Sequence, residues 1–269
     1  MVMLLAGEHA AHTDAGRDLV ARLDLSSGAH AADVAGTSFP EAAARIRLRK
    51  ALILSWLQEL HTAGSPASRL LIVPGAGLGP LGVDWCALHS DARAIELDYE
   101  NVDAKRSLIA ETVDCEIASR VGCLQCDLRD LNSTRRALAS AGWVPATPAV
   151  WVIEGLSYYL PPEALEALVR LALAGNSANR VILEFSLSRE VLSPEAAART
   201  QAYHQFIAEM VGQRELVVTD IDQLVREASA SVEQLLHPAE IEARLSWPPF
   251  FRGADDSSMR IALLAPSHA

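Results

Sequence analysis

A glycine-rich turn and the acids that follow it are the first features of the sequence that could do chemistry. The turn is Pro74-Gly75-Ala76-Gly77-Leu78-Gly79, and its glycines let the backbone bend sharply and approach a ligand without a Cβ in the way. Asp98 ends the next apolar segment, about 20 residues further on, where a carboxylate can accept hydrogen bonds from both hydroxyls of a ribose. Glu96 lies two positions earlier on the same strand face, so either acid could hold the ribose. These residues predict a nucleotide-type ligand.

The spacing of the glycines separates two classes of nucleotide ligand. Dinucleotide-binding proteins need Gly-x-Gly-x-x-Gly, whereas this chain has Gly-x-Gly-x-Gly from Gly75 to Gly79, so NAD is the weaker candidate. A tight turn before a helix, with Asp98 as a helix cap, is the structural alternative to a ligand site.

Two more acids follow the next two predicted strands. Asp127, with Leu128 after it, could meet an adenine, because a carboxylate can accept from the amino group while a backbone amide meets the ring. Glu154 follows the apolar residues 150–153, and a buried acid is costly unless paired, so a cationic ligand group would explain it. Tyr158 and Tyr159 add aromatic faces, which attract a positive centre such as a sulfonium. Because strand ends meet at one edge of a parallel sheet, these residues predict a single site.

A predicted long helix before the first strand carries a cluster of bases. Ser38, Pro40 and Glu41 form a capping-box pattern at its start, and apolar residues recur at helical spacing as far as Leu60. The bases are Arg45, Arg47, Arg49 and Lys50. They form either a solvated face or the partner of an anionic ligand group, and the sequence leaves both interpretations open.

The elements that position these residues alternate between strands and helices. The strand candidates are Leu70–Val73, Ala94–Leu97, Val121–Cys126, Ala149–Ile153, Val181–Phe185 and Ile261–Leu264. Helical segments between them predict βα units and a mostly parallel sheet. Residues 193–245 are predicted to be a largely helical insertion over the ligand edge, with a strand at Glu215–Thr219. We therefore expect a helical extension over residues 1–64 and an α/β core over residues 65–269.

Composition and charge restrict the class of protein. The 269 residues are 50% hydrophobic and 21% charged, which indicates a folded globular chain. The net charge of −11 disfavours nucleic acid and anionic membrane surfaces as partners. No apolar run reaches the roughly 20 residues of a spanning helix, and the amino terminus lacks a signal-peptide pattern, so we expect a cytoplasmic protein with a small-molecule substrate.

Cys123 and Cys126 form a Cys-x-x-Cys pair. Such a pair could be a redox site or half of a zinc site, but no second pair of ligands completes a metal set. We interpret both cysteines as small core side chains and expect no metal.

The same segments resemble the leucine carboxyl methyltransferase-like group of class I S-adenosylmethionine (SAM) enzymes. The resemblance covers about residues 45–185 and rests on LLIVPGAGLGP, AIELDYENVDAKRSLI, LQCDLRD and VIEGLSYYLP, the last being similar to the family's Glu-Gly-x-x-x-Tyr-Leu element. It implies a Rossmann-like α/β fold with a mostly parallel seven-stranded sheet, an N-terminal helical extension and a helical lid. The chain departs from the family pattern where Gly79-Pro80-Leu81 replace the usual Asp-Thr-Arg.

The resemblance also implies which residues would hold SAM. They are Gly75, Ala76 and Gly77 for the methionine part, Asp98 for the ribose, Asp127 and Leu128 for the adenine, Glu154 and Gly155 near the methionine amine, and Arg49, with Lys50 as second choice, for the carboxylate.

Three functions stay open, and we rank methyl transfer first. The acceptor would be a carboxyl or hydroxyl of a small natural-product or amino-acid-type substrate. A carboxylate needs only a cation such as Arg45 or Arg47, whereas a hydroxyl needs a base such as His204 or His237.

The second hypothesis is cyclisation of SAM to azetidine-2-carboxylate with loss of methylthioadenosine. It rests on a resemblance to azetidine-2-carboxylate synthases in Tyr159 and Ser186, with Tyr158 beside them. The third hypothesis is a non-catalytic SAM-binding module. A homodimer also stays open.

Overall fold

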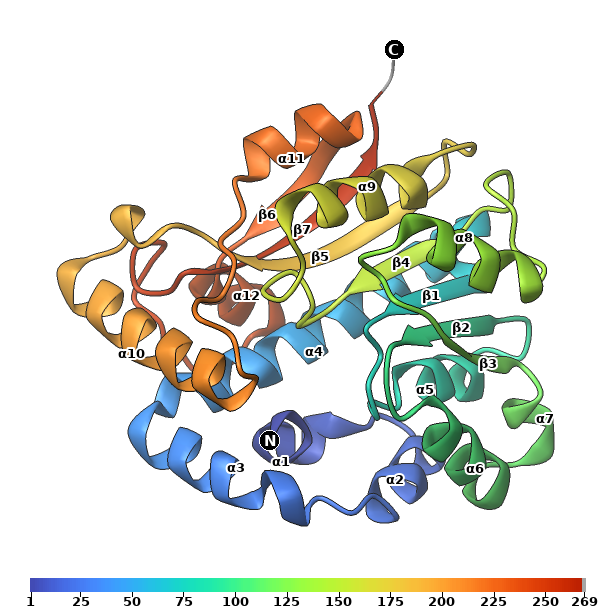
Figure 1. Cartoon of the computed structure of the whole chain (residues 1–269), viewed down its shortest axis with the longest axis horizontal. Coiled ribbons are helices and arrows are strands. Elements are labelled where there is room, and N and C mark those ends of the chain that lie inside the picture. The colour runs from blue at the N-terminus through green and yellow to red at the C-terminus, as the bar shows by residue number, and fades with distance from the viewer. Residues whose placement is uncertain (268–269) are drawn as a thin grey trace.

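The computed structural model describes residues 1–267, and a seven-stranded sheet lies at the centre of this part of the chain (Figure 1). Its strands are β1 (Leu70–Pro74), β2 (Arg93–Asp98), β3 (Val121–Gln125), β4 (Val150–Ile153), β5 (Arg180–Ser186), β6 (Ala230–Leu236) and β7 (Met259–Pro266). The order across the sheet is β3-β2-β1-β4-β5-β7-β6. The first five strands are parallel, and β7 is antiparallel to its neighbours β5 and β6. The predicted α/β fold with a mostly parallel seven-stranded sheet is confirmed.

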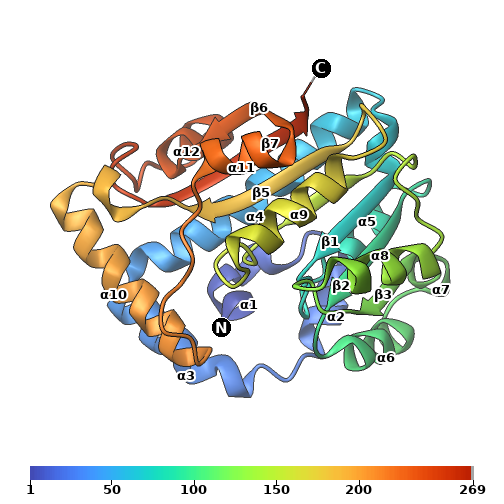
Figure 2. The same ribbon diagram turned by 45° about the horizontal axis from the view of Figure 1, so that its top comes forward.

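Helices cover both faces of the sheet (Figure 2). On one face, Trp151 and Leu183 pack with apolar side chains of α8 (Leu131–Ser140), α9 (Pro162–Leu173) and α11 (Ile221–Ala228). On the other face, Leu71 and Val150 pack with α4 (Pro40–Thr62), α5 (Leu81–Leu88) and α12 (Pro238–Leu245). Burial on both faces explains why these strands are almost continuously apolar in the sequence.

The remaining helices lie around this core. They are α1 (Val2–Ala6), α2 (Asp14–Ala21), α3 (Ser26–Ser38), α6 (Val102–Thr112), α7 (Cys115–Ala118) and α10 (Pro194–Met210), with short 3-10 turns at Gly7–Ala10, Pro66–Arg69 and Arg189–Val191. Figures 1 and 2 both place α10 beside α3, and the ring of Phe39, which follows α3, contacts the rings of Tyr203 and Phe206 on α10.

The long basic helix α4 begins at Pro40, as expected from the preference of proline for the first helical turn. The capping-box prediction for Ser38 is wrong, because Ser38 ends α3 and the N-cap position of α4 is Phe39, which makes no side-chain cap. α4 packs its apolar face against the sheet and carries Arg49 to the ends of the strands.

The region between residues 193 and 245 differs from the expectation in two ways. Residues 215–219 form no strand, and residues 230–236 form β6, which the sequence analysis missed. β6 is an edge strand with mostly polar or partly exposed residues and an irregularity between Val232 and Gln234, so it lacks the apolar run that marked the other strands.

Cys123 and Cys126 are both buried in apolar clusters and free of disulfides, as expected for core side chains. Burial raises the pKa of the two thiols to about 12 and about 11. Among the helices of residues 1–267, not one combines the length and the apolar character that crossing a membrane requires.

Candidate functional site

The glycine turn after β1 has the backbone conformation that glycine provides. Gly75 and Gly77 have φ angles of 68° and 52°, in the left-handed region where side chains are strained. A Cβ on Gly75 would lie 3.0 Å from Leu156, whereas a Cβ on Gly77 would meet no atom within 4 Å. Gly77 therefore leaves its backbone open toward the space beyond the turn.

Asp98 lies next to this turn at the end of β2. Its Oδ2 accepts a hydrogen bond of 2.6 Å from the Gly77 N–H, and its Oδ1 accepts one of 2.7 Å from the Tyr99 N–H. Asp98 is half-buried, so the strand end and the glycine turn are held together by a carboxylate that still reaches solvent.

Glu96, the other acid considered for the ribose, lies in the protein interior. It is 2% exposed, pairs with Lys105 at 2.6 Å and accepts the Gly82 N–H at 3.1 Å. Glu96 lines the cavity beside the glycine turn, but Lys105 neutralises its carboxylate. The Asp98 carboxylate accepts only backbone N–H groups among residues 1–267 and keeps its charge unpaired, which favours Asp98 as the ribose partner.

Asp127 and Leu128 follow β3 at the same edge of the sheet. Asp127 is half-exposed and pairs with Arg129 at 2.7 Å, while Leu128 is 8% exposed and belongs to the main apolar cluster. The hydrogen bond from Arg129 holds the pKa of Asp127 below its usual range.

Four charged residues form a buried cluster where α4 meets the ends of β4 and β5. Arg49 donates from Nε to Glu154 at 2.9 Å and from Nη1 to both oxygens of Glu184 at 3.0 and 2.9 Å. Lys50 pairs with the same Glu154 oxygen at 3.1 Å. Two of the four bases predicted on this helix, Arg49 and Lys50, therefore point toward the strand ends. Glu184 was not among the predicted site residues.

Gly155 packs against the Arg49 guanidinium and has a φ angle of 65°, a left-handed conformation that favours glycine. A Cβ at Gly155 would lie 3.5 Å from Nη2 of Arg49, and the Gly155 N–H donates to Glu184 at 2.8 Å. With Nε and Nη1 held by the two acids, Nη2 is the part of the guanidinium left for another partner.

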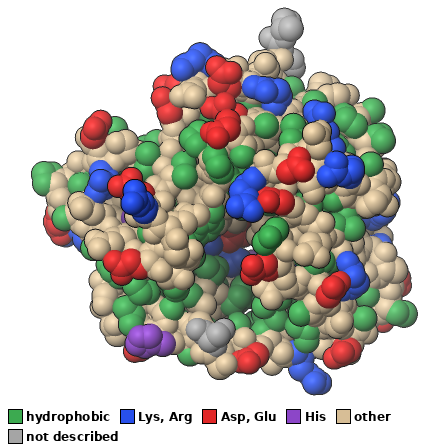
Figure 3. Space-filling view, in the orientation of Figure 1, with side chains coloured by type: hydrophobic (Ala, Val, Ile, Leu, Met, Phe, Trp, Pro, Cys, Tyr) green, Lys and Arg blue, Asp and Glu red, His purple; other side chains and the backbone are tan. Residues whose placement is uncertain are grey.

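Two cavities lie at this cluster, and Arg49 and Gly155 line both of them. The first, of about 200 Å³, is lined by the glycine turn, by Arg49, Lys50, Glu96, Glu154 and Gly155, and by Val2 and Met3 of α1, among others. Asp98, Asp127 and Leu128 are not in its lining. We call it the glycine cavity. The second, of about 70 Å³, is lined by Arg45, Arg49, Tyr158, Tyr159, Glu184, Tyr203 and His204, among others. We call it the aromatic cavity. Figure 3 shows a hollow near the middle of this face, with charged side chains inside it.

Tyr158 and Tyr159 both line the aromatic cavity, as their position after Glu154 suggested. The Tyr158 hydroxyl donates to Glu184 at 2.9 Å. Burial, with a contribution from Tyr203, raises the pKa of Tyr159 to about 12, so its hydroxyl is a neutral hydrogen-bond donor.

Ser186 does not join them. It is the last residue of β5, fully buried, and its Oγ lies 3.4 Å from the Leu187 carbonyl. The lining of the aromatic cavity includes Ser258 and Met259 of the neighbouring chain segment instead. The predicted pairing of Ser186 with Tyr159 in one site is therefore not supported by the geometry.

Of the two histidines considered as bases, only His204 lines the aromatic cavity. Burial, then Arg45 and Arg189, lower the pKa of His204 to about 4, so its ring is neutral near pH 7. His237 caps α12 through the Glu240 capping box.

Glu154 should make stability depend on pH. Burial alone would raise its pKa, but Lys50 and Arg49 lower it from 4.5 to about 2. A carboxyl with a lower pKa in the folded state stabilises the fold above its unfolded pKa, and this contribution is lost as the pH falls through the folded value. We expect the free energy of unfolding to drop by roughly 3 kcal/mol between pH 4.5 and pH 2 from this group.

Urea unfolding across this pH range would measure the effect. The Glu154→Gln variant, which cannot titrate at this position, should have a flatter profile. An identical slope in the two proteins would show that Glu154 is not the titrating group.

Comparison with known proteins agrees with this arrangement. Residues 9–172 match the leucine carboxyl methyltransferase family, which is more than half of the chain. The chain therefore belongs to that family, and the resemblance seen in the sequence is confirmed.

Two bacterial relatives carry the name "Putative S-adenosyl-L-methionine-dependent methyltransferase". The protein from Streptomyces coelicolor is 30% identical over 140 residues, which cover 50% of this chain and 44% of the relative. The protein from Mycobacteroides abscessus is 32% identical over 161 residues, which cover 56% of this chain and 48% of the relative. The alignments thus span about half the length of these relatives.

Solved structures show the same fold at low sequence identity. A "putative methyltransferase from Thermobifida fusca YX" has a TM-score of 0.60 at 16% identity, covering 97% of this chain and 96% of its own. The methyltransferase CalO6 has a TM-score of 0.50 at 19% identity, covering 91% and 73%.

Proposed function

We propose that this chain is a SAM-dependent O-methyltransferase that acts on a small molecule. The observation that carries the proposal is the buried cluster around Arg49, whose residues line both the glycine cavity and the aromatic cavity. With a cosubstrate in the glycine cavity and an acceptor in the aromatic cavity, the two molecules would lie next to each other at the residues that line both cavities. Family membership and the names of the relatives support the same activity.

The residues fit SAM. The open backbone at Gly77 and the Nη2 of Arg49 suit the methionine part with its carboxylate, and Asp98 suits the ribose. Asp127 and Leu128 would hold the adenine. When bound, SAM supplies an electrophilic methyl group, and S-adenosylhomocysteine is the other product.

This chain's own contribution would be alignment and exclusion of water, which can supply about 7–11 kcal/mol of the barrier. The aromatic cavity presents two groups to an acceptor. Arg45 is a buried cation that can hold a carboxylate. His204 is neutral and could accept a hydroxyl proton, but its pKa of about 4 makes it a weak base, which favours a carboxylate acceptor. Of the bases considered in the sequence, Arg45 and His204 line the cavity, whereas Arg47 and His237 do not. Arg47 instead donates to the Leu5 carbonyl at 3.3 Å.

Tyr159 provides a test of the aromatic cavity. We expect Tyr159→Phe to lower kcat roughly 100-fold, because it removes a buried hydrogen-bond donor next to the reacting groups. Stability to urea should change little, since the ring is kept. The matched control is Tyr99→Phe, whose side chain is exposed. Wild-type turnover in Tyr159→Phe would remove Tyr159 from the site.

The function is tested by incubating the purified chain with SAM alone and then with candidate carboxylic acids and alcohols, followed by mass spectrometry. The proposal predicts that SAM stays intact without an acceptor and becomes S-adenosylhomocysteine when one is present. Bound SAM that is never consumed would instead favour a non-catalytic module.

One observation favours SAM cyclisation as a second candidate. The aromatic cavity, at about 70 Å³, is smaller than the glycine cavity of about 200 Å³, and a reaction of SAM alone requires no second substrate in it. Glu154, Glu184 and the Tyr159 hydroxyl lie around this junction and could hold the amine of the methionine part. In the same experiment, methylthioadenosine with azetidine-2-carboxylate, formed from SAM alone, would select this reaction.

A further inference from the structure

Arg45 carries an unsatisfied positive group in the wall of the aromatic cavity. The residue is 7% exposed, and its Nη2 is buried without a hydrogen-bond partner among residues 1–267. Its guanidinium lies 4.7 Å from the ring centre of Tyr203, which is a favourable cation–π contact. A buried guanidinium without a hydrogen-bonded acid is costly, so a partner is expected.

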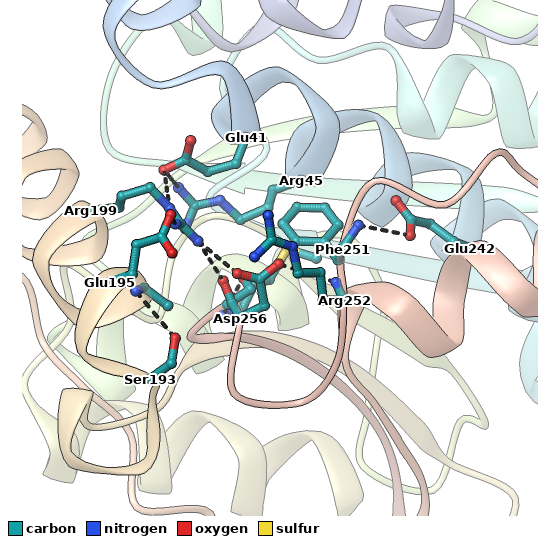
Figure 4. Close-up of polar contacts among 12 residues, drawn as sticks. Glu41, Arg45, Ser193, Glu195, Arg199, Glu242, Phe251, Arg252 and Asp256 are labelled. Atoms are coloured by element: carbon teal, nitrogen blue, oxygen red, sulfur yellow. Dashed lines mark hydrogen bonds and ion pairs between the residues drawn. The ribbon is translucent and has the colours of Figure 1, made fainter.

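The acid nearest to Arg45 holds it only loosely. Glu41, one turn earlier on α4, is 8% exposed and has its Oε1 3.8 Å from Arg45 Nη2. Figure 4 shows both side chains on α4, with dashed lines from one Glu41 oxygen to Arg45 and to Arg199. A distance of 3.8 Å is an ion pair without a hydrogen bond.

Arg199 does not compete strongly for Glu41. It lies 4.0 Å from Glu41, while it binds Asp256 at 2.7 Å and Glu195 at 2.8 Å (Figure 4). Glu41 is therefore shared between two cations, one of which already has close partners. The exchange of Arg45 from Glu41 to another anion would break no close hydrogen bond.

We propose that Glu41 is a competing counter-ion for Arg45: it pairs with Arg45 while the cavity holds no anion, yields it to an acceptor carboxylate, and takes it back after methylation. This rests on the proposed O-methyltransferase activity with a carboxylate acceptor. Methylation forms one C–O bond while the electron pair of the broken S–C bond stays on sulfur, and no proton is released. The resulting ester is neutral, so Arg45 loses its partner in the cavity and Glu41 regains it.

The consequence is that Glu41 is a specificity-determining residue, which weakens the binding of anions and favours release of the ester. A neutral residue at position 41 should therefore improve the binding of a carboxylate and leave a neutral isostere unaffected. A merely structural role would change both ligands alike.

The experiment measures binding of benzoate and of benzamide to the full chain by saturation-transfer difference NMR. Glu41→Gln should bind benzoate about tenfold more tightly than the wild type, with benzamide unchanged. Arg45→Gln in the same background should abolish the gain. The matched control is Glu195→Gln, which removes the same charge from an exposed acid that pairs with Arg199.

Equal benzoate affinity in the wild type and Glu41→Gln, an equal gain in Glu195→Gln, or no benzoate binding in either protein would overturn the proposal. If Glu41→Gln does not fold, Glu41→Met removes the charge with an apolar side chain of similar length, and the same outcomes apply. Titration of S-adenosylhomocysteine tests the proposed function separately, because Glu41 is not in the lining of the glycine cavity.

Discussion

Replacing Arg49 with methionine is expected to lower the free energy of unfolding by about 3–5 kcal/mol, because two buried acids lose their shared cation. Glu154 and Glu184 have side chains only 13% and 3% exposed, and both are hydrogen-bonded to Arg49. Lys50 still pairs with Glu154 in the variant, whereas Glu184 keeps no cation within pairing distance among residues 1–267. Urea unfolding at pH 7 measures the loss.

A second substitution distinguishes the destabilisation caused by the unpaired buried acid from that caused by lost packing. Arg49→Met with Glu184→Gln should recover part of the stability, because it removes the acid left without a partner. The control for a lost ion pair at the surface is Arg17→Met, since Arg17 pairs with Asp14 in solvent and such a pair is worth about 1 kcal/mol or less. A loss in Arg49→Met as small as in Arg17→Met would contradict the buried-cluster account.

The second large effect concerns Asp98. We expect Asp98→Ala to weaken the binding of SAM by about 1.5–3 kcal/mol, the range for losing hydrogen bonds to a charged group. This corresponds to roughly a 10- to 150-fold rise in Kd by calorimetry. Part of the effect would come through the glycine turn, because Asp98 also accepts the Gly77 N–H.

Asp98→Asn distinguishes the loss of the negative charge from the loss of the hydrogen bond to the glycine turn, since its amide oxygen can still accept from the Gly77 N–H. Asp103→Ala, at the exposed first turn of α6, is the control for a lost acid near the same strand end. Unchanged affinity in Asp98→Ala would reject Asp98 as the ribose partner.

The fold was largely predictable because its strands are buried on both faces. Six strands stand out as short apolar runs, such as Val181–Phe185, and their ends in the structure differ from the predicted ends by at most two residues. β6 could not be recognised in this way, because it lies at the edge of the sheet and exposes polar side chains.

The site was predictable where a strand end carries an unusual residue. The acids Asp98 and Glu154 both lie at strand ends, and Glu154 belongs to the buried cluster. Glu184 shows the same signal, an acid within an apolar strand, and could have been found by the rule that singled out Glu154.

The partners of Arg45 could not be predicted. Which face of α4 turns inward depends on how the helix packs against the sheet, and the contact of Arg45 with Tyr203 depends on where α10 crosses it. Ser186 shows the limit of reasoning from strand ends. Its position after a strand suggested that a ligand could contact it, but the side chain is fully buried.

The most direct measurement is a calorimetric titration of SAM and of S-adenosylhomocysteine into the purified chain, repeated with Asp98→Ala. We predict saturable one-to-one binding of both nucleosides, weakened by the substitution. A flat titration for both compounds with a chain that is folded by circular dichroism would contradict the assignment of the strand ends as their binding site.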